Sequence, residues 1–451
     1  MRIIIGGMGK FGAYLCGELC HEGHEITVID INTDVLERAM ESYDVRTVEG
    51  SITSIDVQNE AEMSSAEVFM ALTASDEVNI TSSIIARQLG AKHTVARLRD
   101  QEYGAHMGFM RNNLGISYLL NPDYGAARYL AEMLQFPAVY AMERFINGAV
   151  TMMEADLAPE SQLTGMNLIN LGQLYPSLLV TAVARGEDIY IPRGKFVLQA
   201  HDIIQVTGNL GDLRRIYQEF QAAKKHYRNV LIVGGGRITY NFLRILAKSK
   251  LKICVIERDE ERAMQLAGEF PQVEIIIGDG TDHKILAEAN IQDYDIMLAL
   301  TGLDELNMMI NLHAQKSNVP RTVTKISRLE MLHLAQDFDL QTIVTPHRLA
   351  GEDIMRYIRA MDRSANTDVD AVYHLMNNRI EAVEMHVPKD SAVINKEIKD
   401  LKIKGGFLIA YIYRQGQVII PHGKDKIRLH DRVVVISLGH RLLDLDEILE
   451  D

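Results

Sequence analysis

The feature that most constrains this fold is an internal repeat, because the sequence carries the same pattern twice. Residues 28–30 (VID) recur as 255–257 (VIE), 227 residues further along the chain. Residues 71–79 (ALTASDEVN) recur as 299–307 (ALTGLDELN). Matching segments continue to the last strands of each copy. A period this long indicates a duplicated module whose copies each need their own core, rather than a short solenoid unit.

Each copy divides into two parts with different patterns. Residues 1–135 alternate short apolar runs with helical stretches, which predicts a doubly wound, Rossmann-like α/β domain with a parallel sheet. Residues 140–222 have short strands broken by Gly and Pro, which predicts a small β-rich α+β domain. The second copy repeats the α/β domain at 228–360 and the β-rich domain at 370–451. We therefore expect four domains, in the order A, B, A, B.

Composition and charge exclude several classes of function. The 451 residues carry 47 Lys and Arg against 61 Asp and Glu, a net charge of −14, which argues against nonspecific binding to nucleic acid or to anionic lipid. No stretch approaches the length of a spanning helix, and the start of the chain does not resemble a secretory leader. The three cysteines fit core positions better than a metal site. The sequence predicts a cytoplasmic protein that binds no lipid directly and no metal.

A glycine-rich motif opens the first copy. Gly7–Gly12 (GMGKFG) follows a strand and begins a helix, the context in which GxGxxG is informative. The first Gly permits a tight turn, the second lets a pyrophosphate approach the backbone, and the third allows close packing of helix on strand. Amides at the helix start favour an anion. Asp30 ends the next strand at the spacing of a carboxylate that binds ribose hydroxyls, and it disfavours a 2′-phosphate. The motif predicts a site for NAD(H) or a plain adenosine nucleotide.

The second copy has a related loop with one departure. Residues 234–239 read GGGRIT, and Glu257 follows at the same spacing as Asp30. Thr239 replaces the third Gly, and we expect its Cβ to crowd the helix against the strand. Arg237 could compensate by offering its charge to a phosphate. A second nucleotide site is therefore predicted at this loop.

Polar residues that follow later strands border the same crevice, since ligands of open α/β sheets bind beyond the carboxyl ends of the strands. Residues 73–76 and 301–304 follow the fourth strand of each copy. For Asp76 and Asp304, the alternative that the threonine is an ordinary helix cap explains the pattern equally well. Arg97 and Lys325 close the fifth strand, and a basic residue in both copies favours contact with phosphate. A further pair follows the third strand and would face the base: Gly50-Ser51 and Gly278-Asp279-Gly280.

A repeated His-Asp pair near the end of each copy is the remaining motif. His201-Asp202 and His430-Asp431 could suggest a catalytic dyad, but adjacent residues of a strand point to opposite faces. We interpret both pairs as turns before the last strand. A dehydrogenase would need a substrate domain with a general acid or base, and the small β-rich domains offer none. The sequence predicts no catalytic residues and suits a nucleotide sensor.

Taken together, these motifs resemble the RCK family (KTN plus RCK-C) of potassium-transport regulators. The residues that carry the resemblance are the GxGxxG helix start, VID, ALTASDEVN, the Arg that ends the fifth strand, and the trailing β-rich domain, in tandem over nearly the whole chain. The resemblance implies a homo-oligomeric ring under a membrane potassium channel subunit of the TrkH or TrkG type. It also implies binding of NAD(H) and of ATP or ADP. The nucleotide contacts that it implies are Gly7, Met8, Gly9, Lys10, Phe11, Asp30, Ser51, Thr73, Ala74 and Arg97, then Gly234, Gly235, Gly236, Arg237, Ile238, Glu257, Asp279, Thr301, Gly302 and Lys325.

The expected function is therefore noncatalytic, nucleotide-dependent regulation of potassium uptake at the inner face of the cell membrane. Two alternatives remain from other classes. One is an NAD-dependent oxidoreductase, whose turnover would change the absorbance of the nicotinamide. The other is a simple adaptor that uses a nucleotide only for stability.

Overall fold

In a computed structural model, the chain divides into two compact units, each built from both copies of the repeat. Residues 1–132 and 227–355 form the first unit, and residues 133–226 and 356–451 form the second. The structure describes residues 1–100, 108–109, 113–135, 139–145, 150–208, 211–213, 215–216, 227–328, 330–338, 340, 342–361, 369–376, 379–439, 442 and 444–450. None of the described helices is long and apolar enough to cross a membrane.

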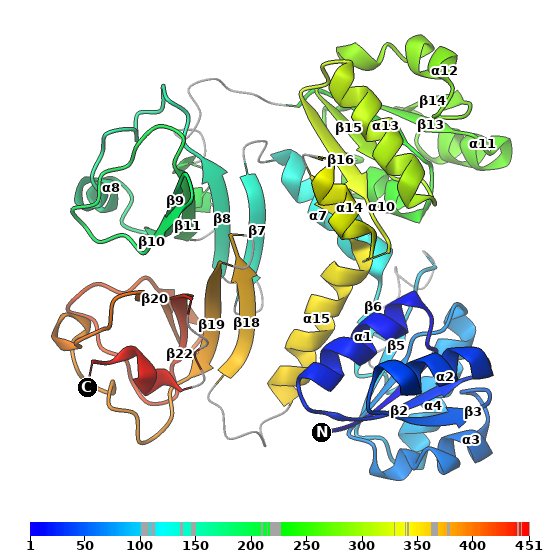
Figure 1. Cartoon of the computed structure of the whole chain (residues 1–451), viewed down its shortest axis with the longest axis horizontal. Helices are drawn as coiled ribbons and strands as arrows, with labels where there is room; N and C mark the ends of the chain where they lie inside the picture. Colours follow the sequence, from blue (N-terminus) through cyan, green and yellow to red (C-terminus); the bar gives the residue numbers. More distant parts are fainter. Residues whose placement is uncertain are drawn as a thin grey trace. The chain divides into compact units, whose positions relative to one another are not determined.

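The first unit contains two six-stranded parallel sheets with the same strand order, β3-β2-β1-β4-β5-β6 and β14-β13-β12-β15-β16-β17. This is the order of a Rossmann fold, and helices cover both faces of each sheet (Figure 1). The central strands are buried throughout, as Ile3, Ile4 and Ile5 of β1 show with no exposed surface. The predicted doubly wound α/β class is confirmed for both copies.

The elements of the first α/β half are β1 (Arg2–Gly6), α1 (Lys10–His21), β2 (Glu25–Asp30), α2 (Thr33–Ser42), β3 (Arg46–Glu49), α3 (Ile55–Glu60), η1 (Met63–Ser65), β4 (Val68–Ala71), α4 (Asp76–Leu89), β5 (His93–Arg97), β6 (Tyr118–Leu120) and α7 (Pro122–Gln135). The second half has β12 (Asn229–Val233), α10 (Arg237–Ile245), β13 (Lys252–Glu257), α11 (Glu260–Glu269), β14 (Glu274–Ile277), α12 (His283–Glu288), η3 (Ile291–Asp293), β15 (Ile296–Ala299), α13 (Asp304–Lys316), β16 (Arg321–Lys325), α14 (Met331–Asp337), β17 (Ile343–Val344) and α15 (Pro346–Met361).

The last helix of each half crosses to the other half. Helix α15 lies against α1 of the first half (Figure 1), so closely that a Cβ on Gly351 would overlap the ring of Tyr14. In return, α7 begins beside α10 of the second half, where Asp123 forms an ion pair with Arg237. The two halves are thus joined by a reciprocal exchange of helices.

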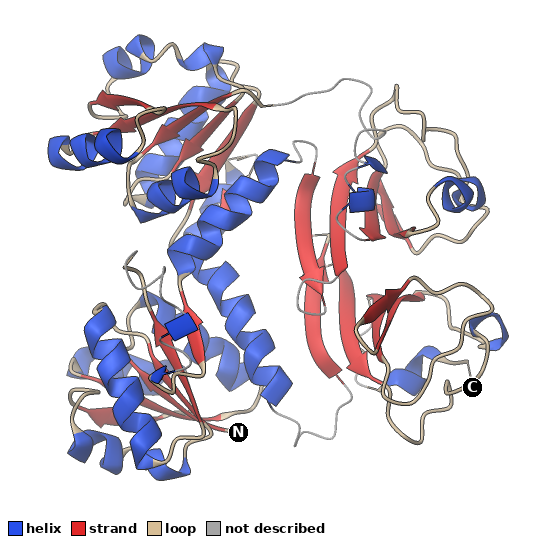
Figure 2. Cartoon of the chain, turned by 180° about the vertical axis from the view of Figure 1, so that it is seen from behind, coloured by secondary structure: helices blue, strands red, loops and turns tan. Residues whose placement is uncertain are grey.

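The second unit contains two five-stranded antiparallel sheets, β10-β9-β11-β8-β7 and β18-β19-β22-β20-β21, which appear as strand-rich modules with little helix in Figure 2. Buried side chains of both sheets, including Phe145 and Tyr411, form one shared hydrophobic cluster. The predicted β-rich α+β class is confirmed. The elements are β7 (Val139–Phe145), β8 (Val150–Asp156), α8 (Leu168–Leu174), β9 (Leu178–Arg185), β10 (Asp188–Tyr190) and β11 (Ile203–Gly208), then β18 (Val369–Leu375), β19 (Ile380–His386), η4 (Ile398–Asp400), β20 (Phe407–Arg414), β21 (Gln417–Ile419), β22 (Arg432–Leu438) and η5 (Leu445–Ile448).

The repeated His-Asp pairs are turns. His201 has a left-handed backbone with φ of 65°, and His430 has φ of 67°. The following aspartates are buried, and each carboxylate binds an arginine of the same module, Arg185 with Asp202 and Arg414 with Asp431. These residues therefore fix the loop before the last strand.

Candidate functional site

The first glycine-rich loop connects β1 to α1 at the carboxyl edge of the sheet. Gly7 has a left-handed backbone with φ of +96°, and a Cβ there would lie 2.9 Å from the amide nitrogen of Thr73. A Cβ on Gly12 would overlap the carbonyl oxygen of Gly7, so the third glycine is needed for the helix to approach the loop. Gly9 differs, because no atom lies within 4 Å of the position of its Cβ. The chain's own packing does not require that glycine, and the open space beside it fits a closely approaching phosphate.

Asp30 holds this loop in place. Its Oδ2 accepts a hydrogen bond from the amide of Met8 at 2.6 Å, and its Oδ1 accepts one from the amide of Asn32 at 2.9 Å. The carboxylate oxygens have further lone pairs that could accept bonds from ribose hydroxyls. Phe11 is buried, so its backbone amide rather than its ring could face a ligand, whereas Met8 is 5% exposed and lines the cavity beside this loop.

The second loop has the same construction, connecting β12 to α10. Glu257 Oε2 accepts a hydrogen bond from the amide of Gly235 at 2.6 Å, as Asp30 does from Met8. Gly234 has φ of +106°, and the Cβ position of Gly236 is open within 4 Å. Ile238 is buried at the position equivalent to Phe11.

The sequence predicts that Thr239 crowds the helix against the strand, but the structure accommodates its side chain. Its side chain is fully buried, and its hydroxyl donates a hydrogen bond to the carbonyl oxygen of Gly234 at 2.5 Å. In the first half, the equivalent Gly12 has no side chain and packs directly on the carbonyl group of Gly7. The second loop therefore keeps its shape with a threonine.

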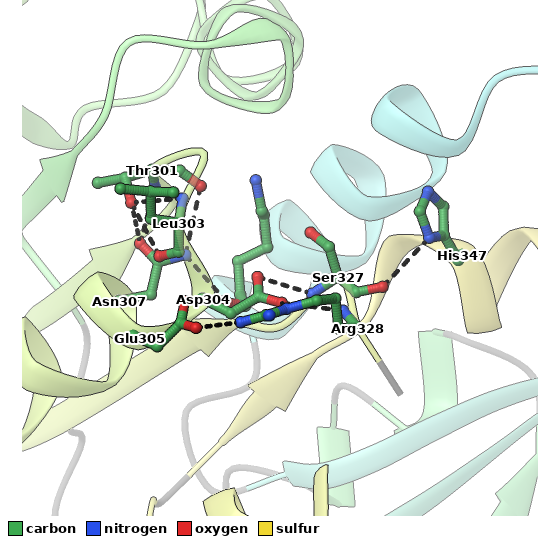
Figure 3. Close-up of polar contacts among 9 residues, drawn as sticks. Thr301, Leu303, Asp304, Glu305, Asn307, Ser327, Arg328 and His347 are labelled. Carbon is green, nitrogen blue, oxygen red and sulfur yellow. Dashed lines mark hydrogen bonds and ion pairs between the residues drawn. The ribbon is translucent and has the colours of Figure 1, made fainter. Parts of the chain in front are cut away.

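A buried asparagine, which sequence reasoning missed, ties the fourth and fifth strands together in each half. Asn79 Oδ1 accepts hydrogen bonds from the amide and hydroxyl of Thr73, while its Nδ2 donates to the carbonyl oxygens of Thr73 and Arg97. Asn307 makes the same bonds to Thr301 (Figure 3), and its Nδ2 also donates to the carbonyl oxygen of Lys325. The signal was available, because both asparagines belong to the matched segments of the repeat.

Asp76 and Asp304 brace the loop that follows the fifth strand of their half. Asp304 accepts hydrogen bonds from the amides of Ser327 and Arg328, both at 2.9 Å (Figure 3). Asp76 accepts from the amides of Arg99 and Asp100. The alternative that the threonine caps the following helix is wrong in both halves. The cap of α4 is Ser75, whose hydroxyl accepts a hydrogen bond from the amide of Val78, and the cap of α13 is Leu303, which makes no side-chain cap bond.

Arg97 and Lys325 end β5 and β16 in positions that exclude much water. Burial lowers the pKa of Arg97 to about 10, with the nearby Arg99 as a second cause. Burial also lowers the pKa of Lys325. The Arg97 guanidinium lies 5.7 Å from the ring centroid of Phe11. Cations that are partly removed from water at this edge favour the binding of an anion.

The remaining predicted residues are exposed at the same edges. Ala74 and Gly302 follow the fourth strand, and Ser51 lies after the third, with its hydroxyl 2.8 Å from that of Thr53. Asp279 Oδ1 accepts bonds from the amide and hydroxyl of Thr281, and the hydroxyl bond lowers the pKa of the carboxyl. Lys10 is exposed at the start of α1.

Beside each loop lies a cavity with walls from both halves, which sequence reasoning also missed. The first has a volume of about 750 Å³ and joins Gly9 and Lys10 to Arg328 and His347 of the second half. The second, about 720 Å³, joins Arg237 and neighbours on α10 and α11 to Arg99 and Asp100 of the first half. Both volumes suit a small-molecule ligand.

Removing the Asp30 carboxylate should weaken nucleotide binding at the first loop alone. In Asp30→Ala the amides of Met8 and Asn32 lose their acceptor, and we expect about tenfold weaker binding of ADP in the first half with the second half unchanged. Site-resolved hydrogen exchange under ADP titration measures both halves. Glu37→Ala, an exposed carboxylate on α2, is the charge-matched control. Equal weakening at both loops would contradict this assignment.

The fold and the two loops define a tandem Rossmann-like protein with a dinucleotide-type loop in each half. Comparison with known families agrees, because the TrkA-N domain matches residues 3–122 and 230–346, and the TrkA-C domain matches residues 152–221 and 382–450. The chain belongs to the TrkA family of tandem RCK proteins, which confirms the resemblance noted in the sequence.

Full-length relatives and solved structures extend this comparison. The chain is 28% identical over 448 residues to a Trk system potassium uptake protein TrkA homolog of Archaeoglobus fulgidus, covering 99% of this chain and 100% of the relative. It is 28% identical over 454 residues to Trk system potassium uptake protein TrkA of Vibrio alginolyticus, covering 100% and 98%. The GsuK RCK domain has a similar fold, with a TM-score of 0.64 at 17% identity over 97% of this chain and 92% of that one. The structure described as the GsuK channel bound to NAD gives a TM-score of 0.65 at 17% identity, over 97% and 77%.

Proposed function

We propose that this protein is a noncatalytic, nucleotide-sensing subunit that regulates a membrane potassium uptake channel, with its four domains at 1–135, 140–222, 228–360 and 370–451. The observation that carries the proposal is that each half builds the same loop and carboxylate brace beside a cavity walled by the other half. A ligand in either cavity would contact both halves. A nucleotide that fits one arrangement of the halves better than another would then shift the protein between them.

The ligands that we propose are NAD(H) and ATP or ADP. The open positions at Gly9 and Gly236 suit a pyrophosphate, and the carboxylates of Asp30 and Glu257 suit ribose hydroxyls while opposing a 2′-phosphate. A solved structural neighbour is described as bound to NAD, and another as bound to ADP. The other contacts remain those predicted from the sequence.

The names of relatives in the family support a proposal for the partner and the location. Relatives named as Trk system potassium uptake proteins support a membrane potassium channel subunit of the TrkH or TrkG type as the partner. We propose a homo-oligomeric ring that is cytoplasmic and attached to the membrane through this partner. Co-purification with such a subunit, expressed from the same gene neighbourhood, tests the attachment.

Binding without turnover is the expected result for the isolated full chain. Calorimetry should show binding of NADH and of ADP, while incubation with NADH and panels of metabolites leaves the nicotinamide absorbance unchanged. Turnover of any substrate at about 1 per second or faster would instead establish an oxidoreductase. Indistinguishable domain arrangements with NADH and ATP, measured by small-angle scattering, would favour a simple adaptor.

A further inference from the structure

The two halves differ at one pair of equivalent positions where the crossing helices begin. Pro122-Asp123 at the start of α7 corresponds to Pro346-His347 at the start of α15. Asp123 faces Arg237, whose Nε donates a hydrogen bond to Asp123 Oδ2 at 2.7 Å. His347 instead lies beside Phe11, with ring centroids 5.5 Å apart. A carboxylate therefore faces the helix start of the second loop, and an imidazole faces that of the first.

Asp123 is surrounded by cations from both halves. Besides Arg237, its charge acts on Arg97 of β5 and on Lys325 of β16, where it partly opposes the lowering of their pKa values by burial. The Asp123 side chain is 18% exposed and that of Arg237 is 51% exposed. Arg237 lines the cavity beside the second loop, so the arginine of the pair is accessible from that cavity.

A phosphate at the second loop would need the same arginine. Arg237 is the first residue of α10, directly after the open position at Gly236. A phosphate bound there would bring its negative charge close to the Asp123 carboxylate, and two anions at such a distance repel each other. In the first half, the equivalent Lys10 is exposed and forms no ion pair within the part of the chain that the structure describes.

We propose that Asp123 is a built-in counter-anion of the second site, which a nucleotide phosphate must displace from Arg237 in order to bind. At the first site, no carboxylate of the described residues is bonded to the equivalent Lys10, although the charge of Glu305 acts on it from a distance. Binding in the second half then releases the start of α7 from α10, whereas binding in the first half does not. This inference rests on the proposed nucleotide binding. It adds the order in which the two sites bind, because the first site fills at a lower nucleotide concentration than the second.

Hydrogen exchange of the full chain during titration with ADP tests the displacement. In Asp123→Asn, the ADP concentration that half-protects residues 229–245 should fall about fivefold, the effect expected for a half-exposed ion pair, with residues 2–21 unchanged. In the wild type, ADP should raise exchange across residues 122–135. Asp123→Glu retains the charge and should keep the wild-type midpoint. His347→Asp places a carboxylate opposite Lys10 and should raise the midpoint for residues 2–21.

The outcomes separate this inference from the proposed function. If ADP protects both loops of the wild type but Asp123→Asn leaves the second midpoint unchanged or raises it, the displacement is wrong while nucleotide binding stands. Unchanged exchange of α7 on saturation would also overturn it. If neither ADP nor NADH protects either loop, the proposed function itself fails.

Discussion

Replacing Gly12 with alanine is expected to destabilise the first α/β half by about 3 kcal/mol and to weaken its nucleotide binding by at least about tenfold. The added Cβ would overlap the carbonyl oxygen of Gly7, a backbone atom that can move only with the loop. Helix α1 would have to shift away from β1. The amides of the loop would then lose the positions that Asp30 sets.

Gly9→Ala is the matched control for this prediction. Its Cβ meets no atom within 4 Å, and φ at Gly9 is −65°, which any residue adopts. The stability of this variant should lie within about 1 kcal/mol of the wild type, while nucleotide binding still weakens because the Cβ enters the approach of the phosphate. Urea-dependent hydrogen exchange of residues 2–21 measures stability, and ADP titration measures binding. Wild-type stability in Gly12→Ala would show that the loop is more adaptable than its contacts indicate.

Removing Arg185 is expected to have the largest effect on the second unit. Asp202 is fully buried and accepts bonds from Arg185 Nε at 2.7 Å, from Arg185 Nη2 at 2.8 Å and from the amide of Gln199 at 2.8 Å. Arg185→Met leaves that carboxylate buried without its cation, which should cost about 3–5 kcal/mol of unfolding free energy. Hydrogen exchange of β9 and β11 in increasing urea measures the loss.

Two further variants serve as controls for Arg185→Met. Lys399→Met removes the cation of a more exposed pair with Glu397 and should leave the free energy of unfolding nearly unchanged, because water screens that pair. The double variant Arg185→Met with Asp202→Leu removes both charges and should recover much of the stability. If Arg185→Met lowers the free energy of unfolding no more than Lys399→Met does, the buried ion pair is not a major source of the stability of this domain.

Local patterns were sufficient to predict which residues lie at the carboxyl edge of the sheet. Gly7 and Thr73 follow a strand and Asp30 ends one, and parallel strands place such residues at one edge of the sheet. The bonds of Asn79 were missed because its position inside a helix gave no local sign of a polar role, although the repeat carried one. Comparing the two copies residue by residue is therefore informative even without other sequences.

Contacts between the halves could not be predicted, because they depend on how two separately folded sheets pack. Asp123 and Arg237 are 114 residues apart, and no spacing rule relates them. The expectation that Thr239 crowds the helix is also wrong, because it considers only the volume of the side chain and not its hydroxyl group. Its hydroxyl compensates by bonding the carbonyl that the missing glycine would have packed against.

The reciprocal crossing of α7 and α15 also bears on how such a molecule can evolve. Two identical chains that exchanged these helices would carry every change at both sites, so a carboxylate opposite one helix start would appear opposite the other as well. Joined in one chain, each half mutates independently of its partner. Glycine and threonine can then stand at the third loop position, and histidine and aspartate at the crossing helices, within one symmetric framework. Fusion thereby allows one gene to keep two different versions of the loop at a fixed ratio of one to one.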